Sequence, residues 1–150
     1  MWQNRLLKRI EILVNVKNAA VNHLDIVEAS GSAREKFPIV LPWVPGHEFS
    51  GVIEEVGKDV TLLKQVTLFS ETANLVLCSG HAVKPGTVVK KPANLSFAEA
   101  ASVPVAAQTA WQGIFTHGQL AKGQTILIHG GAGGVGAGSG FICEPVKRAA

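Results

Sequence analysis

The sequence has few charged residues, no clustered basic stretch and no long apolar run. Charged residues make up 17% of the 150 residues, and the formal net charge is only +3. Because the basic residues are scattered, the stripe with aromatic partners that is typical of a nucleic-acid groove is absent. No apolar stretch approaches the roughly 20 residues that span a bilayer. We therefore expect neither a nucleic-acid nor a membrane partner.

Cysteine is also scarce. The two cysteines, Cys78 and Cys143, lie far apart in the sequence and match no disulfide framework, which suits a reducing compartment. The first ten residues are basic and lack acids, as in a mitochondrial presequence, but Glu11 and a strand-like alternation follow at once. We therefore expect a cytoplasmic protein, with a mitochondrial location as the alternative.

A glycine cluster behind an aliphatic run is the most informative motif. Residues 125–128, Thr-Ile-Leu-Ile, predict a buried strand. Gly131, Gly133 and Gly136 follow in the pattern G-x-G-x-x-G. After a strand, this pattern is typical of a dinucleotide-binding turn, because glycines let the backbone approach a pyrophosphate at a helix N-terminus. A glycine-rich surface loop is the alternative.

The first ninety residues predict a mostly β unit. Residues 11–17 alternate between two faces, as in a half-buried strand, and run into a site-facing turn at 19–25. A second strand is expected at 52–56, with a turn at 57–59 behind it. Further short strands are expected within 60–69, 74–78 and 87–90.

The pattern then changes to helices. Ser96 and Glu99 form an S-x-x-E capping box that opens a short helix. Pro104 fits the first turn of a second helix. Helix, strand, glycine turn and a further helix start together indicate an α/β domain. We therefore expect a β domain at 1–94 and the start of an α/β domain at 95–150.

Taken together, the motifs resemble the medium-chain dehydrogenase/reductase superfamily, in its zinc-independent quinone oxidoreductase (zeta-crystallin-like) branch. The matching pieces occur in the family's order at 20–25, 45–57, 91–96, 100–104, 109–112 and 128–136. The resemblance implies a mixed fold, in which a GroES-like β-barrel catalytic domain is followed by the start of a Rossmann α/β domain. A nicotinamide cofactor would lie between the two.

The resemblance also implies site residues. Asn22 and Thr109 would be the catalytic polar groups near the nicotinamide. From the residues alone, Asn22 reads as a turn residue bonded to its own backbone, and Thr109 as a helix hydroxyl bonded one turn back. The cofactor-binding residues would be Gly131, Gly133, Gly134, Val135 and Gly136.

A metal is not expected. In zinc-dependent relatives the Gly-His-Glu motif, here at 46–48, supplies a zinc ligand together with cysteines. Asn22 occupies the place of the first cysteine, and residues 103–107 offer no later thiolate. We interpret His47 as a turn histidine hydrogen-bonded within the barrel, and Asp25 as a residue that supports Asn22 or caps a turn.

The resemblance implies an NADPH-dependent oxidoreductase that transfers hydride from nicotinamide to a quinone or an α,β-unsaturated carbonyl. NADH is the open alternative as cofactor, and a homodimer is an open alternative to a monomer. Only residues 131–150 follow the expected first Rossmann strand, so the Rossmann domain reads as truncated and the activity as impaired. In addition, Gly138, Gly140 and Pro145 weaken the helix expected after the glycines. The chain also lacks tyrosine, which relatives often place just after the Asn-x-x-Asp turn. The alternatives are a non-catalytic barrel fragment that acts by association with a partner, and a zinc alcohol dehydrogenase-like protein.

Overall fold

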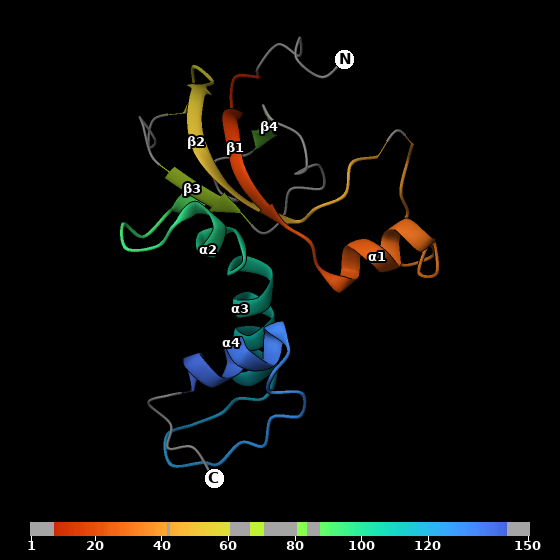
Figure 1. Ribbon diagram of the computed structural model, residues 1–150, viewed down its shortest axis with the longest axis vertical. Helices are drawn as coiled ribbons and strands as arrows, with labels where there is room; N and C mark the ends of the chain where they lie inside the picture. Colours follow the sequence, from red (N-terminus) through yellow and green to blue (C-terminus); the bar gives the residue numbers. More distant parts are fainter. Residues whose placement is uncertain (1–7, 42, 61–66, 71–80, 84–87, 144–150) are drawn as a thin grey trace. The chain divides into compact units, whose positions relative to one another are not determined.

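The computed structural model describes residues 8–41, 43–60, 67–70, 81–83 and 88–143 (Figure 1). The chain divides into two units, residues 1–102 and residues 103–150. The first unit holds the sheet and two short helices, and the second holds helices and a glycine-rich turn. The domain boundary between residues 94 and 95 stays a prediction.

One antiparallel sheet organises the first unit. Its strand order is β4-β1-β2-β3-β5. The two long strands, β1 and β2, pair along most of their length, from Ile12 opposite Val56 to Ala20 opposite Glu48, with two register shifts. The strands are β1 (Ile12–Ala20), β2 (Glu48–Val56), β3 (Thr67–Ser70), β4 (His81–Val83) and β5 (Val88–Lys90).

The core of this unit follows from the alternation in the first strand. Ile12 and Val14 are fully buried, and they form a cluster with Phe49, Val83 and Val88. Side chains two residues apart share one face of a strand, so the alternation places Ile12 and Val14 together. The strands expected at 11–17, 52–56 and 87–90 are confirmed within β1, β2 and β5, and β2 begins four residues early. The strand expected at 74–78 lies outside the described residues.

A helix interrupts the β unit where a turn was predicted. Residues His23–Ser30 form α1, drawn in orange in Figure 1. The prediction of a turn at 19–25 is therefore wrong at both ends, because Ala19 and Ala20 belong to β1 and the helix follows its N-cap, Asn22. The physical reason is a capping arrangement: the backbone N–H of Asn22 donates to Asp25 Oδ2 at 2.7 Å. Such a bond satisfies a backbone donor outside the helical ladder and favours helix initiation.

The capping box predicted at residue 96 is confirmed. Helix α2 (Phe97–Ala101) begins after Ser96, whose side chain accepts from the backbone N–H of Glu99 at 3.2 Å. The carboxylate of Glu99 in turn accepts from Ser96 N at 2.8 Å. Helix α2 lies against β1 and β2, and the buried hydroxyl of Ser50 donates to the carbonyl of Phe97 at 2.6 Å.

In the second unit, the helix expected from Pro104 is also confirmed. Helix α3 (Pro104–Trp111) continues as a π-helix, η2 (Gln112–His117), in which the N–H of Gly118 donates to the carbonyl of Gly113. Helix α4 (Gly134–Ile142) packs against α3. A Cβ at Gly138 would lie 3.5 Å from the carbonyl oxygen of Ala106, which is ordinary van der Waals contact, so the packing of the two helices does not depend on glycine at this position.

The buried strand predicted at 125–128 is wrong. These residues are not part of a sheet, and Leu127 is 81% exposed. A strand is stabilised by a neighbour that accepts and donates its backbone hydrogen bonds. Among the described residues of this unit, no segment pairs with 125–128, so the run stays extended without a strand partner, with Ile126 and Ile128 only half-buried.

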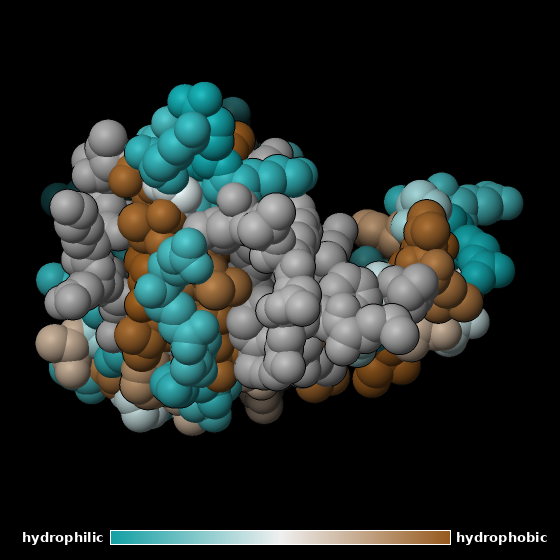
Figure 2. Space-filling view, turned by 90° about the horizontal axis from the view of Figure 1, so that it is seen from above, coloured by the Kyte–Doolittle hydropathy of each residue, from teal (hydrophilic) through white to brown (hydrophobic). Residues whose placement is uncertain are grey.

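The surface carries apolar side chains on α1 and on the segment that follows it. Figure 2 shows hydrophobic atoms at the end of the molecule where α1 lies. Ile26 of α1 is 59% exposed, and Val40 and Leu41 in the segment after it are 84% and 72% exposed. Within the described ranges, no helix has the length and apolar character needed to cross a membrane.

Candidate active site

In the first unit, a cluster of polar side chains joined by hydrogen bonds lies around the N-terminus of α1. Asn22 is half-buried, and its side-chain Nδ2 donates to Glu48 Oε1 at 2.8 Å. Glu48 opens β2 and is only 1% exposed. Because a carboxylate can only accept, this bond identifies the nitrogen end of the Asn22 amide and fixes its orientation. The structure therefore holds Asn22 by its backbone and by its side chain.

Asp25 performs both roles that the sequence left open. Its Oδ2 accepts from the backbone N–H of Asn22, and its Oδ1 accepts from the backbone N–H of Gly46 at 2.8 Å. Gly46 has φ 113°, in the region that favours glycine, so the backbone can turn its N–H towards α1. Asp25 is 4% exposed and joins the start of α1 to the turn before β2.

His47 is hydrogen-bonded, as the sequence suggested, and its partner is Glu28 of α1. Its Nε2 lies 3.0 Å from Glu28 Oε2 and 3.8 Å from Asp25 Oδ1. Asp25 and Glu28 are three residues apart on α1, so they lie on the same face of the helix. Glu28 is 7% exposed, and the side chain of His47 is 13% exposed.

Sequence reasoning missed Glu28. The signals that could have found it are the Asn-x-x-Asp box at 22–25 and Gly31, which ends α1 with φ 71°. Together they predict a helix over the residues between them. Once that helix is drawn, Glu28 falls on the face of Asp25. Its contact with His47, nineteen positions away, has no signal in the sequence.

The thiolates of a zinc alcohol dehydrogenase site are not present at the places that the resemblance indicates. The side-chain Nδ2 of Asn22 donates a hydrogen bond to Glu48. Residues 103–107 contain no cysteine. Cys143 is buried in the second unit, and Cys78 lies outside the described residues.

The glycine motif forms a turn that opens a helix. The N–H of Gly133 donates to the carbonyl of Gly130 at 2.9 Å, and α4 begins at Gly134. A Cβ at Gly136 would collide with the carbonyl oxygen of Gly130, whereas a Cβ at Gly134 would meet nothing within 4 Å. The last glycine of the motif is therefore required for the turn to pack on its own helix. The N–H of Gly133 is used inside the turn.

The remaining predicted residues lie in the second unit. Thr109 is exposed on α3, and Gly131 and Val135 are exposed on the glycine turn and at the start of α4. Asn22 and Thr109 thus belong to different units. The structure groups Asn22 with Asp25 and Glu48, and it groups the predicted glycines with one another.

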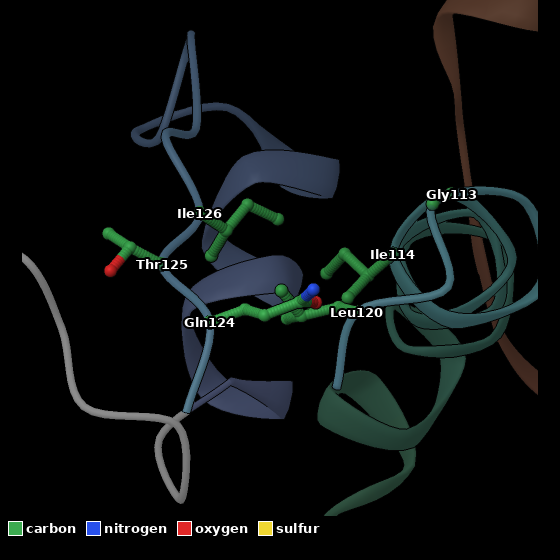
Figure 3. Close-up of a pocket in the computed structure, with 7 residues that line it drawn as sticks. Gly113, Ile114, Leu120, Gln124, Thr125 and Ile126 are labelled. Atoms are coloured by element: carbon green, nitrogen blue, oxygen red, sulfur yellow. The ribbon is translucent and has the colours of Figure 1, made fainter. Parts of the chain in front are cut away.

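The second unit also contains an open hollow of about 560 Å³. In Figure 3, Ile114 and Leu120 point into it from the π-helix and the segment that follows, and Ile126 faces them from the extended run. Thr125 points away from the hollow. No charged side chain lines the hollow, so it offers packing surface and no acid–base group.

The comparisons with known proteins agree on one family. The family described as alcohol dehydrogenase GroES-like domain matches residues 8–105. A 2-methylene-furan-3-one reductase of Solanum lycopersicum is 36% identical over 141 residues, which cover 87% of this chain and 36% of that protein. A chloroplastic NADPH-dependent alkenal/one oxidoreductase of Arabidopsis thaliana is 31% identical, with the same coverage of both chains.

Solved structures give the same result. A quinone oxidoreductase of Pseudomonas syringae pv. tomato DC3000 superimposes with a TM-score of 0.87 at 26% identity, over 99% of this chain and 45% of that one. The chain therefore spans less than half of the length of these relatives.

Proposed function

Because the chain belongs to the alcohol dehydrogenase GroES-like family, within the medium-chain dehydrogenase/reductase superfamily, we propose that it acts as a reductase. The proposed reaction is hydride transfer from NADPH to a quinone or an α,β-unsaturated carbonyl. Family membership and the mixed fold confirm the resemblance drawn from the sequence. The relatives include a protein named for alkenal/one reduction and one named for quinone reduction. The activity, cofactor and substrate of this chain are the proposal.

The observation that carries the proposal is the amide of Asn22, held in one orientation by a buried carboxylate. Glu48 receives the nitrogen end of the amide, so the carbonyl end is the acceptor. A polar group whose orientation is fixed before the ligand arrives loses little entropy when it binds. We assign Asn22 to the nicotinamide end of the site and Thr109 to the same end, as the resemblance implies.

The glycine turn fits a dinucleotide. Helix α4 has nine residues, and its first N–H groups have no partner within the helix, so they can donate to phosphate oxygens. No Cβ narrows the approach at Gly134. We assign phosphate binding to the N–H groups of Gly134, Val135 and Gly136, with Gly131 and Gly133 shaping the turn. When bound, NADPH would supply the hydride.

The experiment is a titration of the chain with NADPH, followed by cofactor fluorescence. The proposal expects saturable binding that Gly136→Ala weakens by about tenfold or more and that Gly134→Ala leaves within about twofold. Consumption of NADPH at 340 nm with a simple quinone and with an enone then separates the two substrate classes. Absence of binding by the chain, and by a chain extended with a full Rossmann domain, overturns the proposal.

A second candidate is a non-catalytic barrel fragment that acts by association with a partner, and the exposed apolar residues in the segment after α1 favour it. Val40 and Leu41 are both more than two thirds exposed. If association is the function, sedimentation should show an oligomer or a complex that Leu41→Ser dissolves, and NADPH should not bind. A homodimer and a cytoplasmic location stay predictions.

A further inference from the structure

The contact between α1 and the turn before β2 gathers three metal-ligating side chains in a buried place. One ligand atom from each of Asp25, Glu28 and His47 lies within 4.8 Å of the others. Both carboxylates are more than nine-tenths buried, and the imidazole is 13% exposed. These residues come from two segments about twenty positions apart, so the fold and not the local sequence brings them together.

The spacing fits a shared ion. Two ligand atoms that each lie about 2.1 Å from one ion are about 3 to 4 Å apart. Nε2 of His47 lies 3.0 Å from Glu28 Oε2 and 3.8 Å from Asp25 Oδ1, within that range, and the three ligand atoms together lie within 4.8 Å of one another. The imidazole nitrogen thus faces both carboxylates with one and the same atom, which is the atom a metal would take.

The charge balance points the same way. Two buried carboxylates face a single imidazole, and in the described part of the chain their ion pairs are with His47 alone. Even a protonated imidazole leaves one negative charge uncompensated, and burying such a charge is costly. A divalent cation with a neutral imidazole would balance both carboxylates.

The carboxylate of Asp25 is already oriented for this role. Backbone N–H groups of Asn22 and Gly46 donate to its two oxygens, and each oxygen keeps a second lone pair. Outer hydrogen bonds of this kind fix ligating carboxylates in metal sites.

We propose that Asp25, Glu28 and His47 bind a divalent transition-metal ion. Mixed oxygen and imidazole ligands favour Zn²⁺, Co²⁺ or Ni²⁺, whereas Ca²⁺ and Mg²⁺ prefer oxygen alone. The site contains no thiolate, and its carboxylate ligands come from α1 in place of cysteines. It differs from the thiolate site that the sequence argued against, but a bound zinc here overturns the sequence prediction of no metal. The proposal does not rest on the reductase assignment.

The test is a calorimetric titration of chelator-treated chain with Zn²⁺, repeated with Co²⁺ by visible absorption. We expect one ion per chain, with binding weakened more than about 100-fold in Glu28→Gln and in His47→Gln, because loss of a mere outer-shell partner already costs 10- to 100-fold. The matched controls are Glu55→Gln, an exposed glutamate of β2, and His23→Gln, an exposed histidine of α1. Both controls should bind zinc within about twofold of the unsubstituted chain.

No saturable binding by the folded chain overturns the proposal, and so does binding by either site variant within about threefold of the unsubstituted chain. Circular dichroism of each metal-free variant checks that it folds. If a site variant unfolds, imidazole NMR of the unsubstituted chain decides: zinc must shift His47, and a shift confined to any of the other four histidines overturns the proposal.

Discussion

Replacing Asp25 by alanine isolates the carboxylate that ties α1 to the turn before β2. The substitution removes the acceptor of two backbone N–H groups, those of Asn22 and Gly46, at 2.7 and 2.8 Å. Loss of a capping side chain costs about 0.5–2 kcal/mol. Leaving the donor of buried Gly46 unpaired costs about 1–3 kcal/mol. We therefore expect Asp25→Ala to lower the free energy of unfolding by about 1.5–5 kcal/mol.

One effect opposes this loss of stability. Removing Asp25 also removes a negative charge beside the buried Glu28, and relief of that repulsion would stabilise the variant. The two hydrogen bonds should prevail, because both are short and both donors belong to the backbone, where no side-chain rearrangement can re-pair them.

The assay is urea unfolding followed by circular dichroism, in the presence of a chelator. The control is Asp59→Ala, whose partner Arg9 has a side chain 67% exposed. Exposed ion pairs are worth about 0–1 kcal/mol, so the control should change stability by no more than that. A loss below 1 kcal/mol in Asp25→Ala, or a gain in stability, would refute the reasoning, because it would show that charge repulsion decides the energetics of this contact.

Four further predictions concern other parts of the chain. Hydrogen bonds from Ser96, first from its backbone and then from its side chain, hold the pKa of Glu99 below its ordinary value of 4.5, and NMR titration should find that Ser96→Ala raises it. Because folding lowers this pKa, ionised Glu99 contributes stability that is present above pH 4.5 and is lost as the pH falls through the folded-state value. Glu99→Gln should therefore be less stable than the unsubstituted chain above pH 4.5, and the difference should disappear in acid unfolding. Phe49→Ala should destabilise the first unit by about 3–5 kcal/mol in urea unfolding, because Phe49 is fully buried in the core cluster, and a loss under 1 kcal/mol would contradict that core. Gly136→Ala should lower the helical circular dichroism of the second unit more than Gly134→Ala does, because only the former drives a Cβ into a backbone carbonyl, and equal spectra would contradict the turn geometry.

The parts of the fold that the sequence predicted are those set by local chemistry. Ser96 and Glu99 cap a helix through bonds three residues apart, and the alternation around Ile12 and Val14 places them on one buried face. The run at 125–128 has equally strong local chemistry, but a strand depends on a neighbour that local sequence does not specify. Local patterns therefore predicted elements, and they failed where an element needs a partner.

The same distinction between local patterns and long-range contacts applies to the candidate site. Asn22 and the glycines could be named from motifs, because each lies in a short pattern with fixed spacing. The bond from Asn22 to Glu48 joins positions twenty-six apart, and only the structure reveals it. Missing α1 also concealed Glu28, because its shared face with Asp25 exists only once the helix has formed.

The consecutive residues His47 and Glu48 separate the two proposals. His47 bonds to Glu28 in the middle of α1, whereas Glu48 bonds to Asn22 at its N-cap. Both contacts hold α1 against the sheet, but only Glu48 touches the side chain assigned to the nicotinamide end. A variant of Glu48 that keeps an acceptor, Glu48→Gln, should therefore leave zinc binding intact while it tests the orientation of the Asn22 amide. His47→Gln should abolish zinc binding with the contact between Asn22 and Glu48 still in place. If the two substitutions had the same effects on zinc and on NADPH, the two sites would be one.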